Sequence, residues 1–283
     1  MSTQIQSLKV QEDQVINSET KHDKLIESAK EGNLEGVKRL IQNGADINAC
    51  DSDALYQSAS RGHIEVVKYL VEHGSGGKNA ALETSSEFEK FEILKYLIQN
   101  GVNIHTYNDT ALRWSAYHGN FEMVKYLIKN GADINANNGE TLGNSVSRGH
   151  WDIVKYLIEE CNADVNSNNN YALRTSVKNG NLEMIKYLIQ HGADIHANND
   201  EALRKSVERG DFKMVKYLVE EYNADIYAQD NFALKTSAYN IRYNEQEDFD
   251  IFNFLIQRGA DIEIVNYITE PTSKNYLDSL KKK

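Results

Sequence analysis

A leucine recurs at intervals of about 30 residues, and this period constrains the fold of the 283-residue chain more than any other feature. The successive steps are 30, 27, 30, 30, 31, 30 and 31 residues, which is within the range typical of repeat proteins. The period therefore predicts eight copies of one structural unit. The copies open at Leu25, Leu55, Leu82, Leu112, Leu142, Leu173, Leu203 and Leu234.

Each copy has the pattern of two short helices. In the fourth copy, "ALRWSAYHG" predicts a first helix that ends at a glycine, and "NFEMVKYLIKNG" predicts a second helix. The apolar residues that share one face of this second helix are Met123, Val124, Leu127 and Ile128. A helix pair this short cannot bury its apolar face alone, so neighbouring pairs must stack into a continuous core. The sequence thus predicts an all-α repeat solenoid.

The repeated residues resemble the ankyrin repeat. The match is carried by "ALYQSASRGHIEVVKYLVEHG" at residues 54–74 and by "GADINA" at residues 44–49 and 131–136. The resemblance implies about eight stacked helix-turn-helix repeats over residues 23–265, between a polar leader (residues 1–22) and a short tail (residues 266–283). The Thr-Pro pair of the family is absent, since the one proline is Pro271. The period is also shorter than the family's value of about 33 residues, which predicts short hairpin loops.

The amino-acid sequence of the repeats is similar to that of the ankyrin families of giant DNA viruses of amoebae, of the mimivirus type. The similarity lies in the recurrent "KYLI" and in the asparagine-rich tips "NANNGE", "NSNNN" and "HANND". It implies a viral protein that acts inside the host cell, in the cytoplasm. A coding sequence rich in A and T would by itself favour asparagine, lysine, isoleucine and tyrosine, and is therefore an alternative explanation for this composition.

Several copies depart from the common length. Two copies of 31 residues carry one extra residue in the second helix, and Asn162 or Asn223 replaces the closing glycine; asparagine is the next best residue for a left-handed cap. The hairpin "SGGKNA" is three residues short, and the turn that follows it has Glu89 where glycine is usual. We expect a weak junction there. In the last copy, "YNIRYNEQEDFD" predicts a polar, acidic loop between the two helices.

Composition narrows the classes of partner. The formal net charge of -11 opposes general binding to nucleic acid or to an anionic membrane. No apolar run approaches the roughly 20 residues that span a bilayer, and the N-terminal segment lacks the apolar centre of a signal peptide. Two cysteines cannot build a disulfide framework. These features predict a soluble, intracellular protein, which we expect to be monomeric.

No pattern of catalytic residues stands out. A serine recurs in every copy, but no histidine or acid recurs with it, so we interpret the serines as small packing residues rather than nucleophiles. The tyrosines of the second helices are interpreted as packing residues with solvated hydroxyls, and the Glu-Lys pairs three residues apart as exposed ion pairs. The histidines are spread over different copies, and we expect no cofactor or metal site.

The resemblance implies that residues near the end of each first helix face a groove that binds a partner. The candidates are Trp114, Tyr117, His118, Arg148, Lys178, Lys205, Arg209 and Tyr239. Because these cations and aromatics occur on an acidic chain, we expect the acidic residues to lie elsewhere and the groove of repeats four to eight to be basic. The expected partner is an acidic protein segment, with nucleic acid as the lesser alternative.

Arg113, Arg174 and Arg204 stand where the family usually has histidine. They either extend this basic surface or merely bind backbone carbonyl groups, and the sequence leaves both interpretations open. The resemblance implies a non-catalytic scaffold that binds a partner protein. The alternative is an adaptor that recruits substrates to a host ubiquitin ligase or another effector enzyme.

Overall fold

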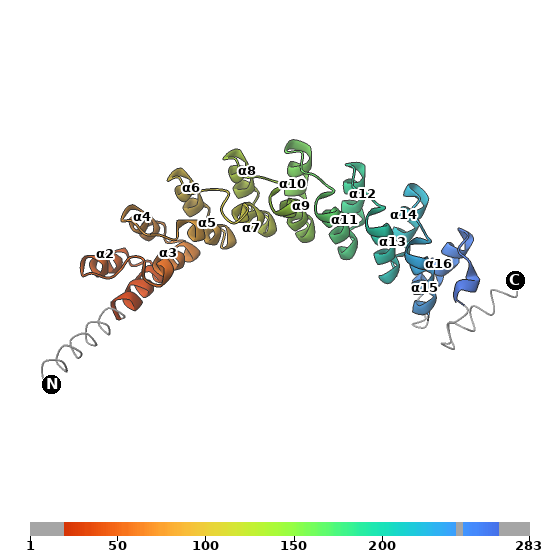
Figure 1. Cartoon of the computed structure of the whole chain (residues 1–283), viewed down its shortest axis with the longest axis horizontal. Coiled ribbons are helices and arrows are strands. Elements are labelled where there is room, and N and C mark those ends of the chain that lie inside the picture. The colour runs from red at the N-terminus through yellow and green to blue at the C-terminus, as the bar shows by residue number, and fades with distance from the viewer. Residues whose placement is uncertain (1–19, 242–245, 266–283) are drawn as a thin grey trace, which may run out of the picture. The chain divides into compact units, whose positions relative to one another are not determined.

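The computed structural model describes residues 20–241 and 246–265, and all regular elements in these ranges are helical. The described helices occur in repeated pairs, as Figure 1 shows, which confirms the predicted all-α repeat solenoid. The chain divides into two compact units, residues 1–137 and 138–283. Most of the predicted leader and all of the predicted tail lie outside the described residues.

The first unit begins with a helix over residues 20–30, which is the first helix of repeat one. Its other helices are α2 (Leu34–Gln42), α3 (Ala49–Arg61), α4 (Ile64–Glu72), α5 (Lys78–Glu87), α6 (Phe91–Gln99), α7 (Thr110–His118) and α8 (Phe121–Lys129). The first helices α3, α5 and α7 pack against each other in sequence order, and so do the second helices α2, α4 and α6.

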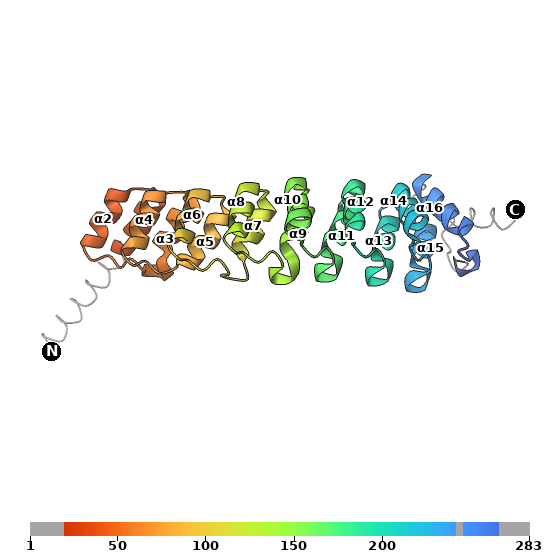
Figure 2. The ribbon, with the colours of Figure 1, turned by 90° about the horizontal axis from the view of Figure 1, so that it is seen from above.

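The second unit continues the same pattern. Its elements are α9 (Ala136–Arg148), α10 (Trp151–Lys155), a π-helical turn (Tyr156–Glu160), α11 (Ser167–Asn179), α12 (Leu182–Gln190), α13 (Ala197–Glu208), α14 (Phe212–Tyr222), α15 (Ala228–Asn240), α16 (Gln246–Gln257) and a 3-10 turn (Ile262–Val265). Within each unit the helix pairs follow one another in chain order, as Figure 2 shows from above.

The repeated leucines lie at the centre of this stack. Leu55, Leu112 and Leu203 are fully buried between neighbouring helices. Burying a leucine side chain is worth about 1.5–3 kcal/mol. Since the same position is filled in every described repeat, each helix pair is held by its neighbours, as the period predicted.

The asparagine-rich tips form single left-handed turns. At six of the described tips three consecutive residues have positive φ, between 49° and 68° for those that are not glycine. They are residues 50–52, 107–109, 137–139, 168–170, 198–200 and 229–231. Asparagine, aspartate and glycine tolerate this conformation better than other residues. The backbone conformation therefore gives a physical reason for the composition of the tips, which is independent of their resemblance to the viral ankyrin families.

The two 31-residue copies absorb their extra residue differently. In one, the helix that starts as α10 widens into the π-helical turn before Asn162, whereas in the other α14 continues as an α-helix to Asn223. Both asparagines adopt left-handed backbone, with φ of 54° and 53°. The prediction that they replace the closing glycine is confirmed.

The acidic stretch of the last copy is not the loop that we expected. Residues 246–250 form the first turns of α16, and Asp248 is buried there. Acidic side chains are favourable in the first turn of a helix because of the helix dipole, which explains why this polar segment is helical. Residues 242–245 lie outside the described part of the chain.

Candidate partner-binding surface

Three of the predicted binding residues form an aromatic cluster on α7 of the first unit. Trp114, Tyr117 and His118 are spaced three and four residues apart, so they share one face of the helix. The Trp114 ring lies 5.5 Å from that of Tyr117, edge to face, and 5.6 Å from that of His118, nearly parallel. All three are half-buried. The cluster is a pre-ordered aromatic surface of the type enriched at binding hot spots.

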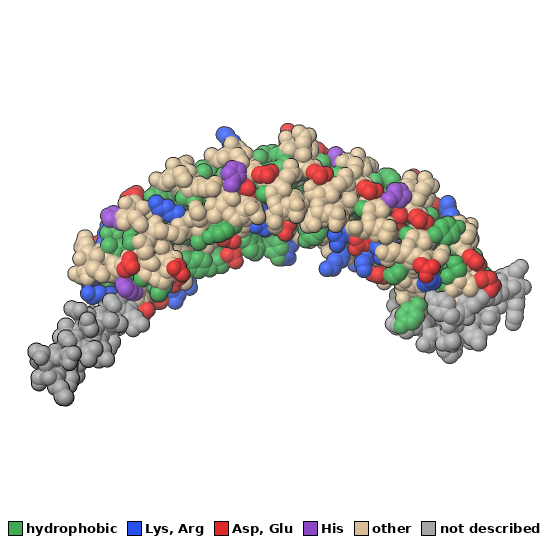
Figure 3. Space-filling model, in the orientation of Figure 1, with side chains coloured by type: hydrophobic (Ala, Val, Ile, Leu, Met, Phe, Trp, Pro, Cys, Tyr) green, Lys and Arg blue, Asp and Glu red, His purple; other side chains and the backbone are tan. Residues whose placement is uncertain are grey.

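Two other predicted residues meet in the second unit. Lys178 on α11 and Lys205 on α13 line the same cavity of about 340 Å³. Arg174 of α11 lines it as well, and Figure 3 shows basic side chains over these two helices with acidic ones beside them. The remaining lining residues are Ser147, Tyr171, Thr175, Asn179 and Glu201.

The expectation that acidic residues lie elsewhere is wrong for this cavity. Glu201 Oε2 lies 2.9 Å from Arg174 Nε, and Glu208 Oε2 lies 2.6 Å from Lys205 Nζ. The cavity lining still has three cations and one anion. Each carboxylate neutralises part of the basic surface, and a partly exposed ion pair of this kind contributes only about 0–1 kcal/mol to stability.

Arg209 has a structural role that the sequence did not reveal. Its Nη1 donates a 2.6 Å hydrogen bond to the carbonyl oxygen of Lys178 in the preceding repeat. The guanidinium also lies over Gly180, where an added Cβ would be 2.5 Å from Nη2. Asn179 makes the equivalent bond to the carbonyl oxygen of Ser147, at 3.0 Å. These side chains therefore join successive repeats.

The last two predicted residues lie apart from these clusters along the chain. Arg148 is exposed at the end of α9, and Tyr239 is 46% exposed near the end of α15. Neither of them is among the residues that line the cavity between α11 and α13. The predicted set is thus an aromatic cluster in one unit and a basic cavity in the other, with Arg148 and Tyr239 outside both.

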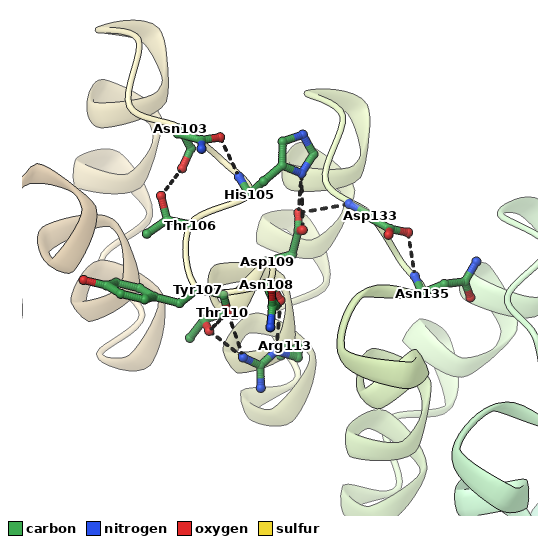
Figure 4. A network of polar contacts seen from close by, with 10 residues as sticks. All are labelled: Asn103, His105, Thr106, Tyr107, Asn108, Asp109, Thr110, Arg113, Asp133 and Asn135. Carbon is green, nitrogen blue, oxygen red and sulfur yellow. Dashed lines mark hydrogen bonds and ion pairs between the residues drawn. The ribbon is translucent and has the colours of Figure 1, made fainter.

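Two of the three unusual arginines bind backbone carbonyl groups. Arg113 Nη2 donates to the carbonyl oxygen of Tyr107 at 3.1 Å, and Arg204 Nη2 donates to that of Asn198 at 2.9 Å. Both acceptors lie in the left-handed turns, as Figure 4 shows for Arg113. The interpretation that these arginines satisfy carbonyl groups is confirmed for both, whereas Arg174 pairs with Glu201.

A buried carboxylate links neighbouring hairpins in two places. Asp109 Oδ1 accepts a 3.0 Å hydrogen bond from the backbone N–H of Asp133 and lies 3.1 Å from His105 Nδ1 (Figure 4). In the second unit, Asp200 Oδ1 accepts a 3.0 Å hydrogen bond from the backbone N–H of Asp225 and lies 3.0 Å from His196 Nδ1. The sequence signal was a carboxylate at the third tip position, which our sequence reasoning missed.

The recurrent serines are packing residues, as interpreted. In seven of them the hydroxyl donates to a carbonyl oxygen of its own helix at 2.7–3.0 Å. They are Ser58, Ser85, Ser115, Ser145, Ser176, Ser206 and Ser237. A hydroxyl that is held in this way inside a helix pair is not exposed to a substrate.

Among the second-helix side chains the ion pairs behave as interpreted, whereas the hydroxyl of Tyr187 is bonded to a side chain and is not simply solvated. Tyr187 donates from its hydroxyl to Glu159 Oε1 at 2.8 Å, and partial burial together with this bond raises the pKa of Tyr187 above its usual range. The Glu-Lys pairs are formed and exposed, for example Lys125 with Glu122 at 2.8 Å. In the described part of the chain no three histidine, cysteine or acidic side chains are grouped to hold a metal ion.

Comparison with known proteins bears on the repeats alone. A family model described as ankyrin repeats, in three copies, matches residues 25–106, 77–138 and 142–230. No match was found among curated proteins. None of the helices in the described ranges combines the length and apolar character that crossing a membrane requires.

Proposed function

Because this chain belongs to the ankyrin-repeat family, whose repeats generally act as protein–protein interaction modules, we propose that it is a non-catalytic scaffold that binds a partner protein through its first helices. The observation that carries the proposal is the cavity between α11 and α13, whose lining includes the cations Arg174, Lys178 and Lys205 together with one acidic side chain. The aromatic cluster on α7 provides a second contact surface of the same kind.

The charge of the cavity favours an acidic segment as the partner. Three cations and one anion line it, and Lys205 is also paired with Glu208, so a net positive charge remains there although the chain as a whole carries a net charge of -11. A local positive field on an acidic protein attracts acidic segments and repels basic ones, which contributes more to association rate and specificity than to affinity. Lys178 is exposed at this site, so its ammonium group is accessible to a carboxylate.

Charge reversal in the cavity tests this proposal. The Lys178→Glu, Lys205→Glu double variant and the unchanged chain are each used to capture proteins from a cell lysate, and the captured amounts are compared by quantitative mass spectrometry. We expect the double variant to capture at least about tenfold less of the partner proteins. Lys186→Glu is the matched control, because Lys186 lies on the second helix α12 in an exposed ion pair with Glu183 at 3.2 Å. If the control variant loses the captured proteins and the double variant retains them, the partner binds the second helices and the proposal is wrong.

Removal of the aromatic anchor is a separate test in the first unit. Truncating a hot-spot tryptophan costs about 2 kcal/mol or more, so Trp114→Ala should weaken capture roughly 30-fold. Trp151→Ala is the control, because Trp151 is also half-buried but lies on the second helix α10, with its ring 5.6 Å from that of Tyr187. Equal effects of the two substitutions would mean that the α7 cluster does not bind the partner.

The viral origin and the location in the host cytoplasm are part of the same proposal. They are supported by the recurrent "KYLI" and the asparagine-rich tips of the repeats, not by the fold. Immunofluorescence of the expressed chain in an amoebal host tests the location, with accumulation outside the cytoplasm as the opposing result. A monomer is expected too, and sedimentation equilibrium measures it.

A further inference from the structure

The shortened hairpin after repeat two leaves a cavity in the row of hairpins of the first unit. From Gly74 to Leu82 the chain takes 8 steps, against 11 from Gly131 to Leu142. The short hairpin keeps a single left-handed residue, Gly77, where the other tips have three in succession. The resulting cavity has a volume of about 400 Å³ and is lined by Ser75, Gly76, Gly77, Lys78, Asn79, Ala80 and Tyr107.

Two glycines let the backbone pass close to the preceding hairpin. The N–H of Gly76 donates a 2.6 Å hydrogen bond to Asn48 Oδ1, and Gly77 has φ of 63°. A Cβ at Gly77 would lie 3.0 Å from Cβ of Ser52, which is tighter than most such contacts. This close approach places the start of α5 directly at the cavity.

The start of α5 presents hydrogen-bond donors without a cap. Gly77 is the N-cap and supplies no side chain, so the N–H groups of Lys78 and Asn79 have no acceptor within the helix. The other first helices α3, α7, α11 and α13 also begin without a side-chain cap, whereas the second helices α8 and α12 begin at Asn120 and Asn181, whose side chains accept from the third helical N–H. An uncapped helix start carries a partial positive charge, and the ammonium group of Lys78 adds a full one.

A buried serine at the same cavity is an independent sign of a ligand. Ser75 is 1% exposed, and its Oγ has no hydrogen-bond partner among the described residues. Repeats one, four and six have alanine at this position, so the hydroxyl is not needed for packing. These residues are Ala45, Ala132 and Ala193. A buried hydroxyl without a partner requires an explanation, and an absent ligand is one.

We propose that this cavity binds an oxyanion, namely a phosphate or carboxylate group. Its lining residues carry the backbone N–H groups at the start of α5, the Ser75 hydroxyl and the Lys78 ammonium, all of which can donate hydrogen bonds. Backbone amides at a helix start together with a lysine are suited to an anion. The site lies in the first unit and does not depend on the first-helix surface proposed above.

A titration of the full chain with inorganic phosphate, followed by amide NMR, tests the site. At constant pH and ionic strength we expect saturating shifts at the amides of Gly77, Lys78 and Asn79. Ser75→Ala and Lys78→Gln should each weaken the apparent affinity about fivefold, the effect of one hydrogen bond. Ser75→Ala should fold normally, because other repeats carry alanine there, and the dispersion of the unbound spectrum verifies this.

Controls and a second ligand make the result specific. Ala132→Ser, which adds a hydroxyl at the equivalent position of repeat four, and Lys129→Gln, which removes a cation from the end of α8, should both leave the affinity unchanged. A parallel titration with acetate distinguishes the sources: saturation by phosphate alone indicates a phosphoryl ligand, and saturation by acetate indicates a carboxylate. If neither anion saturates these amides, or if Ser75→Ala and Lys78→Gln bind as tightly as the unchanged chain, the proposal is wrong.

Discussion

Repeats three and four of the first unit have the same helix pair but different connections. In repeat four the tip before α7 is a left-handed turn that ends at Asp109, and the turn between the helices closes with Gly119 at φ of 79°. In repeat three the short hairpin has Gly77 as its one left-handed residue, and the turn closes with Glu89 at φ of 58°. The same stack thus tolerates two local solutions of unequal quality.

The helices themselves differ in the same direction. α5 buries Thr84, Ser85 and Ser86, whereas α7 buries Ser115 beside Ala116. The Ser85 and Ser86 hydroxyls both donate to the carbonyl oxygen of Leu82, at 2.7 and 3.2 Å, so they are satisfied. Hydroxyl groups nevertheless add less to the hydrophobic core than methyl groups. The comparison teaches that the leucine core specifies the fold, while tips and turns set local stability.

The largest expected effect is an early opening of repeats one and two. The stability of stacked repeats depends on each interface with a neighbour, so a weak repeat three disconnects the repeats before it. We expect hydrogen exchange at amides before about Gly77 to be roughly 100-fold faster than in α7 and α8, which corresponds to about 2.7 kcal/mol. Equal protection in all these repeats would remove the distinction between repeats three and four.

Removing the carboxylate of Asp109 should weaken repeat four. Asp109→Gly keeps the left-handed backbone but loses the hydrogen bond from the Asp133 N–H, and a bond to a charged group is worth about 1.5–3 kcal/mol. We expect a loss of that size in the free energy of unfolding, measured by urea denaturation. Asp109→Asn is the control, because Asn170 accepts the equivalent bond from Asp194 at 3.1 Å. If Asp109→Asn lowers the free energy of unfolding by as much as Asp109→Gly does, the stabilisation comes from the charge of Asp109 rather than from its hydrogen bond.

Exchanging the turn residues should reverse part of the difference. Glu89→Gly removes the strain of a side chain in the left-handed region and should raise the stability by about 1 kcal/mol, whereas Gly119→Glu should lower it by a similar amount. Thermal unfolding of the two variants and of the unchanged chain measures both. If Glu89→Gly lowers the stability, the turn of repeat three is not strained.

The smallest effect is expected where the two repeats agree. Lys95 pairs with Glu92 at 2.6 Å and Lys125 pairs with Glu122 at 2.8 Å, both on exposed faces. Lys95→Ala and Lys125→Ala should each change the stability by less than about 0.5 kcal/mol, and less still in high salt. A large and unequal response in urea denaturation would mean that the second helices contribute to the difference after all.

Much of the fold could be predicted because its determinants are local. The leucine period predicted the units, the apolar spacing predicted the helices, and asparagine in place of glycine predicted the left-handed caps at Asn162 and Asn223. The helical start of α16 was missed because an acidic, polar segment is typical of a loop as well as of a first helical turn. The left-handed turns at the tips were missed because asparagine-rich segments have more than one explanation.

The candidate site could be predicted less completely. The family resemblance placed Trp114, Tyr117 and His118 on one binding surface, and their spacing along one helix explains why the three rings meet. It placed Lys178 and Lys205 among binding residues, but it did not reveal Glu201 beside Arg174 or the bond from Arg209 to the Lys178 carbonyl oxygen. It also noted the short "SGGKNA" hairpin without predicting the cavity at Ser75.

By itself, the sequence determined the repeat, its helix pairs and its buried leucines, since each depends on spacing within about 30 residues and on burial of apolar faces. Only the tertiary structure decided which polar groups are already paired. Arg209 and Lys178, or Asp109 and Asp133, are 31 and 24 residues apart and meet across a repeat interface. Whether such a side chain faces a partner or a neighbouring backbone depends on distances of a few tenths of an ångström, which no period in the sequence encodes.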